Sequence, residues 1–252
     1  MRHAPSLASC LGVLSVVGAV SAHAEDNLRV QMITCPTGDD TQALRLAESM
    51  AAPGAQSVTA QLNYYRAGPI GVFAPKGWTC HAWLGTGGNL LLVTPHSLPP
   101  PFFPLPAVNG AAVLMQLTDT SESGRFHVAI TAARLFPLLG HELVTKVRDE
   151  HLISDSSFDV QPYADDRLQY LSDRLLAYTT PARHTGLGTD SMFESSDLPI
   201  RGVTIFNPNG EIKSMTELRV RLPEAQRALG DAILDLETRC FQLQQGCRSL
   251  TD

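Results

Sequence analysis

The sequence lacks an excess of positive charge. Its 252 residues include 19 lysines and arginines against 25 aspartates and glutamates, a formal net charge of −6. Proteins that bind nucleic acid or an anionic membrane surface carry clustered positive charge. The composition therefore argues against both kinds of partner, whereas an acidic surface suits a basic partner.

Complete catalytic and metal-binding motifs are missing as well. His141-Glu142 has no second histidine to form HExxH, which places two zinc ligands on one helical face, and nearby Asp149 and His151 fit a solvated helix. The glycines of Gly85–Gly88 come with neither the lysine of a phosphate loop nor a third glycine in dinucleotide-binding spacing. We therefore predict no metal and no cofactor.

A nucleophile in a recognisable setting is also absent. No serine lies in a G-x-S-x-G turn. A glycine-bearing stretch brings four reactive side chains close in sequence, but the members of a catalytic triad are normally assembled by the fold. We interpret this stretch as a structural loop and assign no catalytic residue; its four side chains are His184, Asp190, Ser191 and Glu194.

Long apolar runs are limited to the N-terminus, where Leu11 to Val20 is too short to span a bilayer. Arg2 precedes this run, and Ala22-His23-Ala24 supplies the small residues that signal peptidase requires. We predict a signal peptide over residues 1–24, cleaved after Ala24, and a periplasmic or extracellular protein with no transmembrane segment. Cys10 precedes the apolar run, which disfavours a lipoprotein.

Cysteine is scarce, and four of the five cysteines follow the predicted cleavage site. An even number in an oxidising compartment predicts two disulfide bonds, with three possible pairings. We favour Cys35 with Cys80, and Cys240 with Cys247, provided that the last helix ends between the latter two. A zinc site is the alternative, although the paired C-x₂-C spacing of zinc ribbons is absent.

Both tryptophans lie between Gly71 and Pro95, a stretch that predicts a hairpin. A Pro-Gly turn follows Val72-Phe73 and leads into a strand over Trp78–Leu84. Alternation places Trp78, Cys80 and Ala82 on one face of that strand and Thr79, His81 and Trp83 on the other. Glycines 85–88 then reverse the chain into a second strand over Asn89–Thr94.

The remaining periodicities predict a mixture of strands and helices. We expect strands over 28–35, 58–65, 111–117, 126–131, 202–206 and 218–222, the last with Arg219 and Arg221 on a solvated face. We expect helices over 39–52, 141–151, 165–175 and 223–243, with 132–139 open to either assignment and 176–180 a possible strand. The fold class is α+β, a single disulfide-stabilised domain over residues 25–252 with a mainly antiparallel mixed sheet and several packed helices.

The chain resembles exported bacterial proteins of unknown function. The residues that carry the resemblance are Ala74-Pro75-x-Gly77-Trp78-x-Cys80, Gly87, Leu90-x-Leu92-Val93-x-Pro95, Thr180-Pro181, Gly186-Leu187-Gly188-Thr189 and Arg221-Leu222-Pro223. The resemblance implies an envelope or secreted location and brings no known activity.

These observations favour a non-catalytic binding or interaction protein of the bacterial cell envelope, such as an inhibitor or immunity-type partner of a wall-directed enzyme. Its partner would be another envelope or secreted protein. The candidate binding residues are Trp83, Tyr65 and Trp78, because exposed aromatic rings line carbohydrate and peptide surfaces, although buried packing is their commoner role. The alternative function is an envelope hydrolase whose site is assembled only in the fold.

Overall fold

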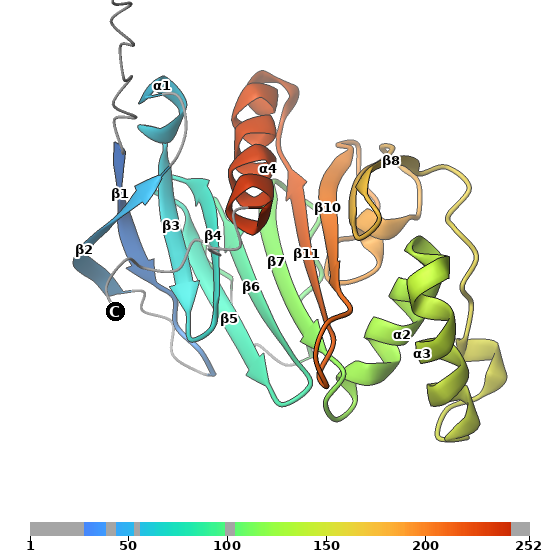
Figure 1. The fold of residues 1–252 in the computed structure, drawn as a ribbon. Helices are drawn as coiled ribbons and strands as arrows, with labels where there is room; N and C mark the ends of the chain where they lie inside the picture. Colours follow the sequence, from blue (N-terminus) through green and yellow to red (C-terminus); the bar gives the residue numbers. More distant parts are fainter. Residues whose placement is uncertain (1–27, 39–43, 53–55, 99–103, 243–252) are drawn as a thin grey trace, which may run out of the picture.

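The protein is built on two β-sheets, seen in a computed structural model that describes residues 28–38, 44–52, 56–98 and 104–242 (Figure 1). The four-stranded sheet has the order β2 (Leu44–Ala52), β1 (Leu28–Thr34), β3 (Leu62–Ala67) and β4 (Ile70–Pro75). The seven-stranded sheet has the order β5 (Thr79–Gly85), β6 (Gly88–Thr94), β7 (Ala112–Asp119), β11 (Ser214–Arg221), β10 (Ile200–Asn207), β9 (Leu175–Thr180) and β8 (Arg167–Ser172).

Helices flank these sheets. The α-helices are α1 (Gln56–Thr59), α2 (Gly124–Leu135), α3 (Pro137–Asp149) and α4 (Arg227–Gln242), with 3₁₀ turns η1 (Asp155–Ser157), η2 (Leu187–Thr189) and η3 (Glu224–Gln226). Strands β1 and β3 pair in parallel, and the other strand pairs are antiparallel. The predicted α+β class with a mainly antiparallel mixed sheet is confirmed.

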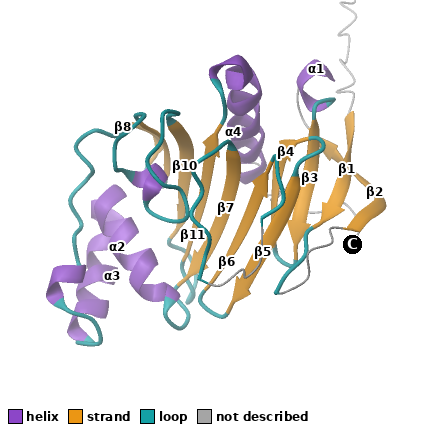
Figure 2. Ribbon diagram, turned by 180° about the vertical axis from the view of Figure 1, so that it is seen from behind, coloured by secondary structure: helices purple, strands orange, loops and turns teal. Residues whose placement is uncertain are grey.

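The main core lies on one face of the seven-stranded sheet, under the four-stranded sheet and α4. Helix α4 contributes Leu229, Ile233, Leu236 and Cys240, which follow the three-to-four-residue spacing predicted for the last helix. Helices α2 and α3 lie on the opposite face (Figure 2). Within the described ranges, no helix is long and apolar enough to cross a membrane.

The predicted glycine hairpin is confirmed as β5–β6, in register from Thr79 opposite Thr94 to Gly85 opposite Gly88. Strand β4, predicted to belong to the same hairpin, pairs instead with β3 in the four-stranded sheet. The Pro-Gly turn after β4 therefore carries the chain from one sheet to the other. A Pro-Gly turn in a sequence indicates where the chain changes direction, but it does not determine which strand the preceding segment pairs with.

The predicted bond between Cys35 and Cys80 is confirmed, with a Cα–Cα distance of 5.4 Å. Next to it, the Ala82 N–H donates to the Pro36 carbonyl at 2.9 Å. These two links join the end of β1 to the outer side of β5 and so connect the two sheets. Cys240 is also disulfide-bonded, and Cys247, its predicted partner, lies outside the described residues.

Three element predictions are wrong, two of them because contacts distant in sequence decide the structure. The segment predicted as a helix before Pro53 is strand β2, which supplies hydrogen-bonding partners for β1. The segment predicted as a strand over 126–131 is helix α2, whose buried Val128, Ala132 and Leu135 have helical spacing. The polar residues before that helix were interpreted as a turn between two strands, so the start of the helix was not predicted.

The helix predicted from Asp165-Asp166 is instead the β8–β9 hairpin, so the alternative strand over 176–180 is the correct one. Asp166 does not cap a helix. Its carboxylate accepts the Thr180 hydroxyl at 2.6 Å and the Leu187 N–H at 2.8 Å. The side chain that favoured a helix start therefore holds two other segments together.

Helix α4 supplies a hydrogen-bond acceptor to β4, the last strand of the four-stranded sheet. Glu237 is half-buried, and its Oε1 accepts the Phe73 N–H at 2.9 Å. Burial of the carboxyl raises its pKa to about 7, and the bond from Phe73 opposes this only in part. The folded protein therefore favours the neutral acid below about pH 7.

We expect Glu237→Gln to be more stable than the wild type at neutral and alkaline pH, where ionisation of the buried Glu237 destabilises the folded protein. Because the pKa is higher in the folded state than in the unfolded chain, the stabilisation is complete below about pH 4.5 and is lost as pH rises through about 7. At pH 8.5 the variant should be more stable than the wild type by about 1–3 kcal/mol, and the two should converge near pH 4.5. Urea unfolding at both pH values measures the difference, and equal differences at the two would contradict the assignment.

Candidate functional site

Strand β11 carries three charged side chains into the interior: Glu217, Arg219 and Arg221 are all buried. The solvated face predicted for the two arginines is therefore wrong. Strand β11 lies in the middle of the seven-stranded sheet, and both of its faces are covered. A buried charge is stable only when it is paired and hydrogen-bonded, so the partners of these three residues define the polar interior.

Arg221 has a structural set of partners. Its Nε donates to the Gly110 carbonyl at 2.8 Å, its Nη1 to the Glu194 carbonyl at 2.6 Å, and its Nη2 to the Val108 carbonyl. Its guanidinium also lies over the Phe193 ring, 4.6 Å from the centroid. The arginine thus fastens two loops to the end of β11.

Arg219, Glu217 and His127 form a charge network between β11 and α2. Glu217 Oε1 accepts Arg219 Nη2 at 3.0 Å, while its Oε2 contacts His127 Nε2 at 2.6 Å. Arg219 further donates to the Gln116 Oε1 at 3.1 Å and to the Leu187 carbonyl at 3.1 Å. The side chain of His127 is 29% exposed and that of Glu217 only 3%, so the network begins inside the protein and ends at the surface.

The pKa shifts follow from this arrangement. Burial alone would raise the pKa of Glu217, but the Arg219 and His127 charges lower it to about 2. Burial alone would lower the pKa of His127, yet Glu217 raises it above its ordinary value, with Arg219 opposing and Asp190 assisting. Glu217 is therefore ionised at neutral pH, and it favours the protonated imidazole.

The contact with Glu217 also fixes the orientation of the imidazole. The ionised carboxylate only accepts hydrogen bonds, so His127 Nε2 is the donor. Gln116 Nε2, 3.3 Å from the same nitrogen, instead finds its acceptor in the Thr118 hydroxyl at 3.2 Å. His127 Nδ1 is left for other partners. Among the described residues, no serine, threonine or cysteine side chain hydrogen-bonds to this histidine.

The loop after β9 lies against the same network. The Gly188 N–H donates to the Thr180 hydroxyl at 2.9 Å, and Asp190 accepts Arg134 Nη1 at 2.9 Å. With the Leu187 carbonyl bound to Arg219, this loop joins β9 to β11. Segments 180–181 and 186–189 thus lie side by side, next to strand β11.

Trp83 lies in register with the network across the sheet. It is opposite Leu90, which is opposite Gln116, which is opposite Glu217. Side chains opposite one another share a face, and neighbouring strands are about 4.8 Å apart, so Trp83 and Gln116 are about 10 Å apart. We call Trp83, Leu90, Gln116 and His127 the binding row; all four are half-buried.

No protein-family model, curated protein or solved structure matches this chain. The candidate site therefore depends on its own geometry. The binding row offers an aromatic ring, an apolar side chain, an amide and an imidazole on one partly exposed surface of about 10 Å. Such a surface can stack against a ligand at one end and hydrogen-bond to it at the other.

The other two aromatic residues predicted to bind lie elsewhere. Tyr65 is only 1% exposed, and its hydroxyl donates to the Pro75 carbonyl at 2.8 Å. It has no surface for a partner to contact, so we correct its predicted role to a structural one. Trp78 is half-buried and packs against the main core on the opposite face from Trp83. Trp83 itself packs edge-to-face against His81, with centroids 4.7 Å apart.

The reactive side chains of the glycine-bearing loop do not assemble into a triad. His184 Nδ1 lies 3.0 Å from Asp165, and both side chains are well exposed. Asp190 pairs with Arg134, and Ser191 and Glu194 are exposed. Within the part of the chain that the structure describes, no group of three histidine, cysteine or acidic residues is placed to hold a metal ion.

Sequence reasoning missed His127, Gln116 and Glu217. One signal was present, since Glu217 and Arg219 alternate with the apolar Leu218 and Val220 in a strand that lies between two apolar neighbours in the sheet. The contribution of His127 was concealed because its segment was predicted to be a strand. Helix α2 places the imidazole above the sheet, within hydrogen-bond distance of Glu217.

Proposed function

We propose that the protein is an exported, non-catalytic binding protein of the cell envelope that recognises another macromolecule through the binding row. The single observation that carries the proposal is the position of Trp83 in register with Gln116, with His127 fixed above it by a buried carboxylate. A tryptophan beside a rigidly held polar group is typical of binding hot spots.

The fixed polar groups favour recognition because they are held before any ligand arrives. His127 is oriented by Glu217, which is held by Arg219, and Gln116 is held by Arg219 and Thr118. Side chains that are already ordered lose little conformational entropy on binding. The row can therefore use most of its interaction energy for affinity and specificity.

Export forms part of the proposal. The sequence predicts removal of residues 1–24, and the intramolecular bond between Cys35 and Cys80 is compatible with an oxidising compartment. The acidic net charge suits a basic partner, such as a wall-directed enzyme that the protein inhibits or against which it confers immunity. N-terminal sequencing of the exported protein would begin at Glu25 if the predicted cleavage is correct.

Affinity capture tests the proposal. The exported, disulfide-bonded protein is immobilised and exposed to an envelope extract, with bound proteins identified by mass spectrometry. We expect one partner, whose affinity falls at least 30-fold in Trp83→Ala, as expected for loss of a hot spot worth about 2 kcal/mol. Leu84→Ala is the matched control, because Leu84 is the next residue of β5, is 46% exposed and points to the other face.

A second function, an envelope hydrolase, is favoured by one observation: a half-buried histidine is oriented by a buried, ionised carboxylate, as in acid–base catalysis. The described residues supply no nucleophile to it, so such an enzyme would have to activate water through His127 Nδ1. If the capture experiment finds no partner, and hydrolysis of wall, ester or peptide substrates is lost in His127→Gln, the recognition proposal is wrong and the hydrolase is correct.

A further inference from the structure

Strand β8 is the open edge of the seven-stranded sheet. It ends the strand order and pairs only with β9 among the described strands. Tyr170 and Leu171 are 55% and 43% exposed. At the opposite edge, β5 is bridged by Thr37 and bonded to Pro36. No described strand pairs with the outward backbone groups of β8, which therefore offer a template on which another strand can form.

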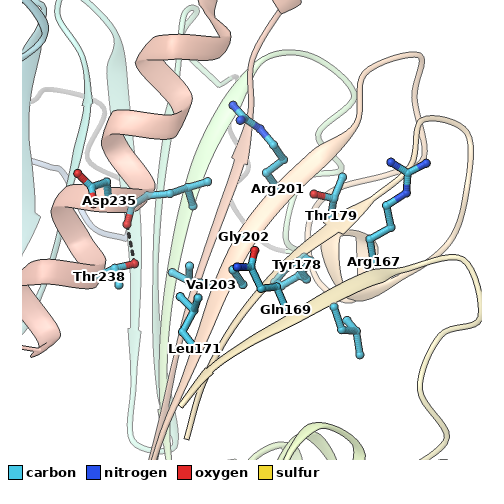
Figure 3. A pocket seen from close by; sticks show the side chains of 13 residues that line it. Arg167, Gln169, Leu171, Tyr178, Thr179, Arg201, Gly202, Val203, Asp235 and Thr238 are labelled. Carbon is cyan, nitrogen blue, oxygen red and sulfur yellow. Dashed lines mark hydrogen bonds between the residues drawn. The ribbon is translucent and has the colours of Figure 1, made fainter. Parts of the chain in front are cut away.

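A groove adjoins this edge on the face of the sheet that α4 covers (Figure 3). It has a volume of about 380 Å³. Leu234, Asp235 and Thr238 of α4 form one wall, and Ala177 and Val203 lie on the strands between that wall and β8. The binding row lies on the other face of the sheet, so the two surfaces are separate.

The residues of β8 that line the groove are Arg167, Leu168, Gln169 and Leu171. The register of β8 shifts between Tyr170 and Ser172, so only Arg167 and Gln169 are alternate residues of the regular part of the strand. Along a strand, such residues follow one another at about 6.6–6.8 Å. The edge thus presents a cation, an amide and an apolar side chain in fixed order. A strand added to β8 would place its own alternate side chains directly opposite Arg167 and Gln169 and would reach Leu171 at the register shift.

The charges around the groove indicate what this strand should carry. Arg201 pairs with Asp231, and Asp235 pairs with Arg239 at 2.6 Å. Arg167 is exposed and forms no ion pair with any residue that the structure describes. The groove therefore has one uncompensated positive charge at one end and exposed Leu171 at the other.

We propose that β8 and its groove bind an extended segment of a partner protein by strand addition, with an acidic side chain opposite Arg167 and an apolar side chain beside Leu171. The main-chain hydrogen bonds supply affinity and the alternate side chains supply specificity, as in other complexes formed by strand addition. This second surface goes beyond the proposed function, and it does not require the binding row to be correct.

A displayed library of random ten-residue peptides tests the proposal on the exported, disulfide-bonded protein. We expect the selected peptides to share an acidic residue and an apolar residue three or four positions apart, because the register of β8 shifts at Leu171. Arg167→Glu should weaken the selected acidic peptides at least tenfold and should select lysine or arginine at the same position. Lys76→Glu is the matched control, because it reverses an exposed charge in the turn after β4 and should change nothing.

Several outcomes would overturn this inference. The first is that no peptide is enriched, and the second is that Arg167→Glu leaves the consensus unchanged. The third is a dimer that is detected by sedimentation and that Leu171→Asp dissociates, because β8 would then be occupied by a second copy of the chain. Trp83→Ala should bind the selected peptides normally. Failure of the peptide experiment is therefore distinguishable from failure of the capture experiment, which depends on Trp83.

Discussion

Glu217→Ala should lower the free energy of unfolding by about 3–5 kcal/mol, because removal of one member of a buried ion pair leaves the other charge uncompensated. Arg219 is fully buried, and Glu217 is its only carboxylate partner among the described residues. The substitution also removes the carboxylate that orients His127. Few other positions combine these two losses.

Thermal unfolding measures the effect, which corresponds to a decrease in Tm of roughly 10–15 °C for a chain of this size. Asp197→Ala is the matched control, since Arg183 and Asp197 form an ion pair in which both side chains are about four-fifths exposed, 77% and 80%. Its stability should be close to that of the wild type, because an ion pair between exposed side chains contributes little. Similar losses in the two variants would show that Glu217 and Arg219 are not energetically coupled.

The pH dependence supplies an independent readout of the same pair. The pKa of Glu217 is lower in the folded protein, about 2, than in the unfolded chain. Its stabilisation is therefore complete above about pH 4.5 and is lost as pH falls toward 2. The difference in stability between the wild type and Glu217→Ala should shrink over this acid range.

Replacing both Cys35 and Cys80 by alanine should cost about 4 kcal/mol, the chain-entropy value for a closed loop of this length. The two cysteines are 45 residues apart in sequence. Both side chains are buried in the main core, so alanine avoids the burial of an additional polar group. Denaturant unfolding of the oxidised variant, with the bond at Cys240 intact, gives the change.

The single variants are the control for this pair. Cys35→Ala and Cys80→Ala should each lose as much stability as the double variant, because either substitution opens the same loop. A double variant that unfolds at the wild-type denaturant concentration would mean that the bond contributes nothing to stability. The link between Pro36 and Ala82 would then be sufficient to join the two sheets.

Local signals were sufficient for several elements of the fold. The β5–β6 hairpin depends on adjacent glycines and on alternation that separates Cys80 from Trp83. The β10–β11 pairing follows from the turn between the two strands, and α4 follows from its apolar spacing. In each case the residues that decide the structure lie within about 20 positions of one another, which is the range over which periodicity operates.

The remaining elements depend on distant partners. Strand β2 has helical spacing but pairs with β1, and Asp166 resembles a helix cap but binds Thr180 and Leu187. The candidate site also depends on residues that are distant in sequence, because Gln116 and Glu217 lie on strands that are adjacent only in space. The sequence predicted Trp83 correctly as a residue on the face opposite Cys80, and it contained no indication that His127 lies beside the same row.

The Cys35–Cys80 bond lies entirely within the first third of the chain, so it can form before most of the seven-stranded sheet is present. Strands β1, β3 and β4 and both cysteines have emerged by residue 80, whereas the central β7–β11 pairing must wait for residue 221. A chain that enters an oxidising compartment N-terminus first can therefore complete this covalent crosslink while the partner strands of β7 are still absent. The four-stranded sheet and its covalent link to β5 can then form before the central strands of the other sheet pair.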